Sequence, residues 1–283
     1  MKKIIKKIFI ALLAVTFVGS AIKITQQTRD YKEGSDAYAE AMAVANLPQI
    51  DESQIEPEIT PTPPSELEQP PVTDAQPAPT PEIPPAEEAP PKVDPYAQAL
   101  ANADVPALQE VNPDVIGWIS IPDTKISYPL LQGEDNDYYL RHTWNKARNS
   151  VGSIFMDYLI NSDLSNFNTL IYGHYMRNGS MFGGLHRYDD LSFWETHPSV
   201  YIKTSAGVYQ YDIFAAYEAK LDEITYALKI TDDSTKLKFI QHGLDRSAID
   251  TGVIPTEQDR IVTLVTCTGR DYSGRWVVQA VLR

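Results

Sequence analysis

Two residues that could carry nucleophilic chemistry stand directly after apolar segments of this sequence. Cys267, the only cysteine, ends the run Ile261-Val262-Thr263-Leu264-Val265-Thr266-Cys267, and His174 follows Asn168–Tyr172 with one glycine between them. A thiolate is a strong nucleophile, and a histidine exchanges protons near neutral pH. The pair indicates covalent attack on a carbonyl carbon. The alternative is a small buried cysteine, the commoner fate of a lone thiol, together with a structural histidine.

A third residue must stabilise the negative charge that forms on the attacked carbonyl oxygen. Arg270 and Arg275 both follow the cysteine closely. If the segments 261–267 and 274–282 are antiparallel neighbours, Arg275 lies nearly opposite Cys267 on a regular strand. A guanidinium stays charged, lowers the pKa of a nearby thiol and donates two parallel hydrogen bonds. We therefore predict Cys267, His174 and Arg275 as the catalytic residues and interpret Arg270 as a surface residue.

The elements that must position these residues are mostly short strands. Apolar or alternating segments separated by turn residues recur through the last two thirds of the chain, which is typical of a β-sandwich or β-barrel. The predicted strands are 115–121, 126–131, 153–156, 168–172, 199–204, 207–217, 261–267 and 275–282. Helices are expected near 96–103 and 105–111, and a polar helix at 233–244 has Leu237, Ile240 and Leu244 at helical spacing.

The first residues differ in character from the rest. Four lysines lie within the first seven residues, and an uncharged stretch from residue 8 to residue 22 follows them. We expect residues 1–24 to be a single-pass membrane anchor with its amino terminus in the cytoplasm and the catalytic part outside the cell membrane. A cleaved secretory signal with a processing site at Gly19-Ser20-Ala21 is the alternative.

The next segment, residues 25–95, is predicted to be a largely disordered extracytoplasmic stalk. Fifteen of the 21 prolines lie between Pro48 and Pro95, and the segment also carries much of the net charge of −14. Such a composition cannot bury enough apolar surface to offset the entropy of ordering. The remaining residues, 96–283, have the size of one globular domain. No basic patch with interleaved aromatic residues indicates a nucleic-acid partner.

Other kinds of site find little support in the sequence. There is no Gly-x-Ser-x-Gly nucleophile elbow, no phosphate-binding loop and no cluster of metal ligands. The acidic segment Gly133-Glu134-Asp135-Asn136-Asp137 has poor spacing for a calcium loop. We therefore expect neither a cofactor nor a metal.

The segment Thr263-Leu264-Val265-Thr266-Cys267, followed after a short loop by Gly274-Arg275, resembles the active-site signature of the sortases. Six further segments are similar to class B sortases and occur in the same order: 112–119, 128–133, 135–140, 152–157, 168–174 and 179–182. The resemblance covers essentially all of residues 96–283. It implies an eight-stranded β-barrel with N-terminal helices and one helix in the loop before the strand of the catalytic cysteine.

The resemblance also implies an activity, namely transpeptidation. Cys267 would attack the carbonyl of a threonine in the C-terminal sorting motif of a secreted protein and form a thioester. An amine of a peptidoglycan precursor, or a pilin lysine, would then resolve this thioester. The resemblance assigns proton transfer to His174, the oxyanion to Arg275, and the substrate groove to Asn136, Leu140 and Thr266.

Two positions depart from the class B pattern. Class B members commonly have an acidic residue shortly after the cysteine, where this chain has Thr268-Gly269, and Asp271 is the available substitute. A serine is frequent two residues before the cysteine, where this chain has Val265. Both positions adjoin the groove, so the motif preference stays open. Two other functions also stay open: a non-catalytic surface binding domain, and a peptidase that only hydrolyses sorting peptides.

Overall fold

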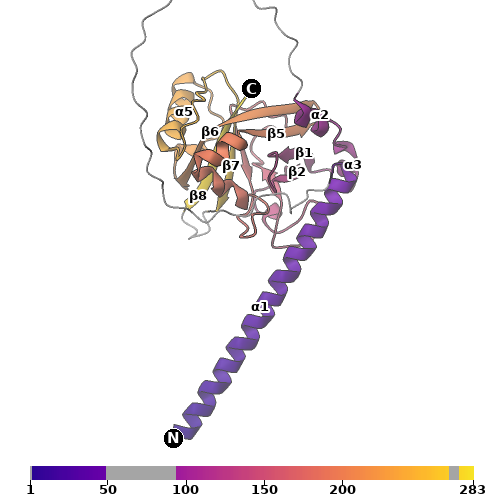
Figure 1. Ribbon diagram of the computed structural model, residues 1–283, viewed down its shortest axis with the longest axis vertical. Helices are drawn as coiled ribbons and strands as arrows, with labels where there is room; N and C mark the ends of the chain where they lie inside the picture. Colours follow the sequence, from indigo (N-terminus) through magenta and orange to yellow (C-terminus); the bar gives the residue numbers. More distant parts are fainter. Residues whose placement is uncertain (1, 49–93, 268–273) are drawn as a thin grey trace, which may run out of the picture.

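The computed structural model describes residues 2–48, 94–267 and 274–283, with side chains from residue 16 onward except that of Cys267. Within these residues eight strands close into a barrel in the order β1-β2-β3-β4-β7-β8-β6-β5 (Figure 1). The strands are β1 Val115–Ser120, β2 Ser127–Leu131, β3 Ile154–Met156, β4 Asn168–Tyr172, β5 Ser199–Thr204, β6 Gly207–Lys220, β7 Ile261–Cys267 and β8 Gly274–Leu282. The predicted mainly-β fold is confirmed.

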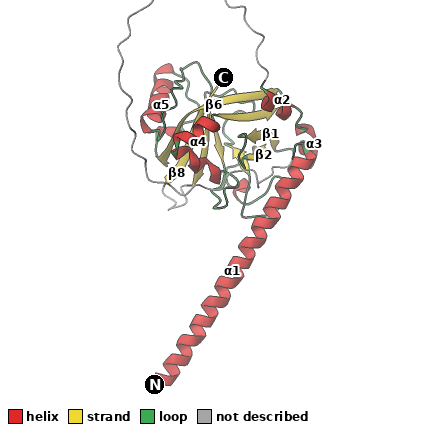
Figure 2. Cartoon of the chain, in the orientation of Figure 1, coloured by secondary structure: helices red, strands yellow, loops and turns green. Residues whose placement is uncertain are grey.

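Helices lie outside the barrel (Figure 2). The short helices α2 (Pro95–Ala101) and α3 (Val105–Val111) precede β1, and each begins with an aspartate cap followed by a proline in its first turn. α4 (Leu191–Thr196) precedes β5, and α5 (Asp233–Arg246) lies in the connection before β7. The helix expected before the cysteine strand is therefore present. Three 3₁₀ helices complete the described part: η1 Tyr138–Leu140, η2 Gly183–Asp189 and η3 Ile224–Tyr226.

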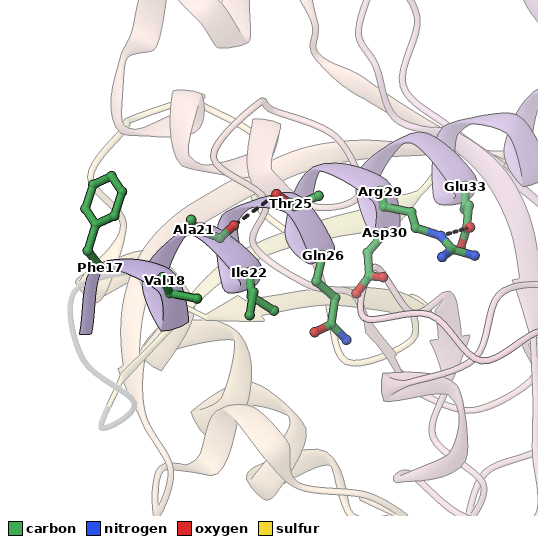
Figure 3. Close-up of a pocket in the computed structure, with 9 residues that line it drawn as sticks. All are labelled: Phe17, Val18, Ala21, Ile22, Thr25, Gln26, Arg29, Asp30 and Glu33. Atoms are coloured by element: carbon green, nitrogen blue, oxygen red, sulfur yellow. Dashed lines mark hydrogen bonds and ion pairs between the residues drawn. The ribbon is translucent and has the colours of Figure 1, made fainter. Parts of the chain in front are cut away.

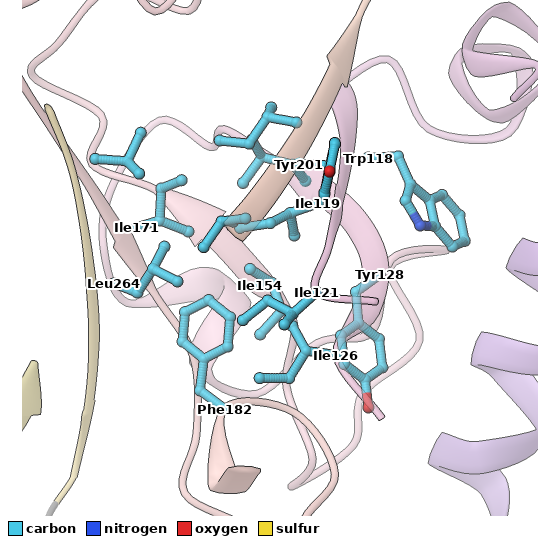
Figure 4. Close-up of a cluster of buried hydrophobic side chains, with 14 of the residues drawn as sticks. Trp118, Ile119, Ile121, Ile126, Tyr128, Ile154, Ile171, Phe182, Tyr201 and Leu264 are labelled. Carbon is cyan, nitrogen blue, oxygen red and sulfur yellow. The ribbon is translucent and has the colours of Figure 1, made fainter. Parts of the chain in front are cut away.

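The barrel interior is filled by one hydrophobic cluster, part of which Figure 4 shows. Ile119, Ile171 and Leu264 enter it from β1, β4 and β7. Successive side chains of a strand point to opposite faces, so their neighbours on β4 and β7 point outward. There, Leu170 and Val265 belong to a second cluster that α5 covers. The sheet is thus buried on both faces at β4, β7 and β8.

The helix predicted at 233–244 is confirmed as α5. Ile240 is buried and Leu244 packs against the second cluster, while Leu237 is 48% exposed. The buried residues of α5 are Phe239, Ile240 and Gly243. A large aromatic residue, an isoleucine and a glycine that permits close approach form most of the contact with the sheet, and Leu237 lies outside it.

The long helix α1 (Lys2–Val44) projects from the barrel (Figure 1), but its last turns pack against it. Tyr38, Ala41 and Met42 are buried in the same cluster as the barrel interior. The indole Nε1 of Trp144 donates a hydrogen bond of 2.7 Å to the carbonyl oxygen of Ala37. The packed body therefore includes residues that precede the expected domain start at 96. The proline-rich segment 49–93 lies outside the described residues.

The structure contradicts the predicted membrane anchor at residues 1–24 and the membrane localisation based on it. In the part of the chain that the structure describes, no helix is both long enough and apolar enough to cross a membrane. A spanning helix needs roughly 17–25 mostly apolar residues. The described side chains of α1 begin at residue 16, and charged residues recur among them from Lys23 onward.

Candidate active site

The backbone brings the three predicted catalytic residues to one end of the barrel. β7 and β8 are antiparallel, and Cys267 pairs directly with Arg275, as predicted from the sequence. β4 and β7 run parallel up to the pair Tyr172 and Val265, and the N–H of Gly173 continues the ladder to the Val265 carbonyl at 3.1 Å. Because His174 and Cys267 each lie two residues beyond that pair, their backbones are neighbours. Their catalytic roles remain predictions.

Arg275 is half-buried, and its Nη1 donates to the carbonyl oxygen of Gly274 at 3.0 Å. It shares the outer face of β8 with Val277, two residues away, which belongs to the cluster under α5. Tyr226 of η3 lies within electrostatic range of the Arg275 guanidinium. Burial raises the pKa of Tyr226 to about 12, and the positive charge of Arg275 opposes that rise.

Tyr226 had not been predicted as part of the site. Its hydroxyl oxygen is buried and makes no hydrogen bond with a described residue. It comes from the long connection between β6 and β7, where no periodic pattern marks a position. Only the tertiary fold brings this residue within electrostatic range of Arg275.

His174 is held by a main-chain carbonyl. Its Nε2 lies 2.7 Å from the carbonyl oxygen of Leu140, the last residue of η1. Since a carbonyl oxygen can only accept, Nε2 must carry a proton, and Nδ1 of the neutral ring is the free acceptor. The arrangement leaves one ring nitrogen to exchange protons with a thiol or an amine.

A hydrogen-bond and ion-pair network fixes η1 and with it the Leu140 carbonyl. Tyr139 donates from its hydroxyl to Asp114 Oδ2 at 2.6 Å, and Lys146 Nζ lies 2.9 Å from the same oxygen. Desolvation alone would raise the pKa of Asp114, but these two contacts outweigh it and hold that pKa below its usual value. The N–H of Ser153 donates to the Tyr139 carbonyl at 2.9 Å and ties the turn before β3 to η1.

The three predicted substrate-binding residues are placed differently from one another. Asn136 and Leu140 lie on the segment that holds His174, and Asn136 is hydrogen-bonded to Asp157 and to the N–H of Tyr158. Thr266 is buried and alternates with Cys267, so it faces the barrel interior together with Leu264. Its hydroxyl has no hydrogen-bond partner among the described residues. A direct contact between Thr266 and substrate is therefore without geometric support.

Four residues of the loop after the cysteine strand were considered above for their effect on the site. They lie outside the described residues: Thr268, Gly269, Arg270 and Asp271. The acidic segment weighed as a calcium loop forms a local turn, since Asp135 accepts hydrogen bonds from the N–H groups of Asp137 and Tyr138. Within the described ranges no group of three or more His, Cys, Asp or Glu residues could hold a metal ion.

A surface hollow on α1 is separate from this site (Figure 3). Its lining residues all belong to α1, from Phe17 to Glu33, and they include the ion pair between Arg29 Nε and Glu33 Oε1 at 2.6 Å. None of the predicted catalytic or groove residues borders it.

Comparison with known proteins gives consistent matches. The sortase domain family matches residues 119–283. Sortase B of Listeria monocytogenes is 39% identical over 177 residues, which are 62% of this chain and 72% of that protein. The structure of a Staphylococcus aureus sortase B–substrate complex is similar with a TM-score of 0.60 and 32% identity, covering 63% of this chain and 84% of that one. A sortase B complexed with triglycine gives a TM-score of 0.60 and 32% identity, with 63% and 86% coverage.

Proposed function

Because this chain belongs to the sortase family of cysteine transpeptidases, and within it to class B, we propose that it joins sorting-motif proteins to an amine through a Cys267 thioester. The observation that carries the proposal is the pairing of Cys267 with Arg275 on adjacent strands, with the backbone of His174 beside them. A family fold alone would not support the reaction. The backbone neighbourhood of Cys267, His174 and Arg275 at one end of the barrel supports it.

The reaction would proceed in two halves. Nδ1 of His174 takes the proton of the Cys267 thiol, and the resulting thiolate attacks the carbonyl carbon of the motif threonine. Arg275 donates hydrogen bonds to the oxygen that becomes negative. As the C–N bond breaks, His174 gives its proton to the leaving amine. The acceptor amine then attacks the thioester, loses its proton to His174, and releases the Cys267 thiolate with a new amide bond formed.

The acceptor that we propose is an amine of a peptidoglycan precursor, which makes the reaction one of cell-wall anchoring. The relative complexed with triglycine, a short peptide, is consistent with a small peptide amine as acceptor. A pilin lysine is the alternative acceptor. The donors would be secreted proteins that carry the motif.

Replacing the nucleophile tests the central step. Cys267→Ala should abolish both turnover and the thioester adduct on a peptide with threonine before the scissile bond, because no other cysteine can substitute. Mass spectrometry of the intact protein after incubation with a library of such peptides measures the adduct. Normal turnover by Cys267→Ala would refute the proposal.

The two arginines provide a matched pair for the oxyanion role. Arg275→Ala should lower kcat/KM on the order of 10²-fold, as expected for loss of one oxyanion donor. Arg270→Ala removes the same charge near the cysteine in sequence and should retain most activity. The reverse ranking would move the oxyanion role to Arg270.

Product analysis separates transfer from hydrolysis. With triglycine as the amine acceptor, the wild-type enzyme should form the joined peptide in excess of the free acid. Free acid alone, whatever the concentration of triglycine, would indicate a peptidase. Full function after thiol alkylation would indicate a binding module.

A further inference from the structure

One buried carboxylate beside the site takes no part in the proposed reaction. Asp157, directly after β3, is 3% exposed and forms no ion pair with a described residue. Its Oδ2 accepts hydrogen bonds from Asn136 Nδ2 at 2.9 Å and from the Tyr172 hydroxyl at 3.0 Å, and its Oδ1 accepts from the N–H of Leu159 at 2.9 Å. A buried carboxylate is costly unless such donors satisfy it.

Two of these donors come from segments that build the candidate site. Tyr172 pairs with Val265, two residues before Cys267, and precedes His174 by two residues. Asn136 precedes η1, whose Leu140 carbonyl holds His174. Asp157 thus connects the strand of the histidine with the segment that supports its ring.

The hydrogen bonds also fix which way the Asn136 amide points. Its Oδ1 accepts the N–H of Tyr158 at 3.2 Å, and its Nδ2 donates one hydrogen to Asp157. Because a carboxylate only accepts, the amide cannot exchange its oxygen and nitrogen without losing both contacts. The second N–H of Asn136 meets no acceptor among the described residues. It is a half-buried donor at a fixed position.

We propose that Asp157 is a positioning residue for substrate binding: it orients the Asn136 amide so that its second N–H donates to a backbone carbonyl of the extended peptide substrate. An extended peptide presents carbonyl oxygens along its length, and a pre-oriented donor binds one without an ordering cost. The inference rests on the proposed function, since it requires a peptide in the groove. It assigns a role in substrate binding to Asp157, which does not itself contact the peptide.

The test compares steady-state kinetics on the best peptide of the threonine library. Asp157→Asn keeps an acceptor for the Leu159 N–H but removes the acceptor that orients Asn136. We expect KM to rise about tenfold, the equivalent of one lost hydrogen bond, with kcat within about twofold of wild type. Asn136→Ala should raise KM equally, and the double variant Asn136→Ala/Asp157→Asn no further, because Asp157 acts through Asn136.

An exchange of the two residues separates positioning from stability. Asn136→Asp/Asp157→Asn restores a hydrogen bond between positions 136 and 157, so the Tm should return toward that of wild type. Position 136 then has no N–H to offer, so KM should stay high. Asp212→Asn is the matched control. Its carboxylate accepts from the Ser199 hydroxyl at 2.9 Å. The backbone of Asp212 pairs with Val281, six residues along β8 from Arg275, so KM should not change.

Each outcome decides one claim. A wild-type enzyme that turns over no threonine peptide overturns the proposed function and this inference with it. Normal wild-type turnover with an unchanged KM in Asp157→Asn, or with a normal KM in the exchanged double variant, overturns the inference alone. If Asp157→Asn does not fold, the exchanged variant decides, because it keeps the hydrogen bond between the two positions.

Discussion

Among single residues, Gly152 controls how closely the turn before β3 approaches the histidine. Its φ of +63° lies in the left-handed region, which other residues adopt only under strain. A methyl group there would lie 2.8 Å from His174 Cδ2 and 2.8 Å from the Tyr139 carbonyl oxygen. The backbone conformation and the contact with the imidazole therefore both require a glycine, and His174 is held by packing as well as by its hydrogen bond.

Gly152→Ala should accordingly impair catalysis as well as stability. We expect a loss of about 1–3 kcal/mol in the free energy of unfolding from strain and overpacking, and at least a tenfold fall in kcat from displacement of His174. Gly252→Ala is the control, since Gly252 has a similar φ of +69° but no atom within 4 Å of the added methyl. It should lose only about 1 kcal/mol and keep its kcat. Equal kcat values for the two variants would show that contact with His174 is unimportant.

Whether a site residue could be predicted from the sequence depends on how close in the sequence its contacts lie. Arg275 could be placed opposite Cys267 because β7 and β8 are consecutive strands, and only a short loop separates them. His174 could be selected because it follows a strand and a glycine. Asp157 and Tyr226 could not be found this way, because the residues with which they interact are distant in the sequence. Asn136 lies 21 positions from Asp157, and Arg275 lies 49 positions from Tyr226. Contacts between parallel strands, or across long connections, leave no periodic pattern in the sequence.

At the scale of elements, one carboxylate, that of Asp114, ties η1 to the segment before β1. Asp114 accepts from Tyr139 within η1 and from Lys146 beyond it, and the Nδ2 of Asn112 donates to the Tyr139 hydroxyl at 2.9 Å. The sequence predicted the strands well because alternation and turn residues are local properties. It contained no sign of η1 as a support for His174, because that role depends on contacts with the segment before β1.

The stability of this element should depend on pH in a defined direction. The folded-state pKa of Asp114 is lowered, so its contribution is present above the unfolded value and is lost as pH falls through the folded one. Asp114→Asn should lower the Tm by roughly 2–4 °C at pH 7. The difference from wild type should be full above the unfolded pKa of about 3.9 and should shrink as pH falls below it, through the lower folded-state pKa. Thermal melts of both proteins from pH 3 to 7 measure it, and a pH-independent difference would contradict the assignment.

At the scale of the whole molecule, α1 is part of the body that holds the site, although the undescribed segment 49–93 separates it from α2 in the chain. Tyr38 packs edge-on against Tyr128 of β2 with ring centroids 5.0 Å apart. Its hydroxyl donates to the Gly152 carbonyl oxygen at 2.5 Å and lies 3.2 Å from Ser153 Oγ. Asn149 and Ser150 of the same turn bind Asp30 of α1 at 3.0 and 2.7 Å. Composition suggested a stalk from residue 25, because the buried residues of α1 are few and spaced among polar ones.

The contact between α1 and the turn at Gly152 gives the last prediction. Tyr38→Phe keeps the aromatic packing but leaves the Gly152 carbonyl without its buried donor, which should cost about 1–3 kcal/mol of unfolding free energy. Since Gly152 abuts His174, kcat should fall too, while KM stays near the wild-type value. Tyr31→Phe, on the same helix, removes a hydroxyl that only accepts an exposed hydrogen bond from Gln27 at 3.3 Å, and should change stability by less than about 0.5 kcal/mol. Chemical denaturation and peptide kinetics on both variants measure the two effects.

If Tyr38→Phe loses stability at unchanged kcat, α1 stabilises the barrel without influencing the histidine. If Tyr38→Phe matches Tyr31→Phe in both stability and kcat, α1 is not part of the packed body.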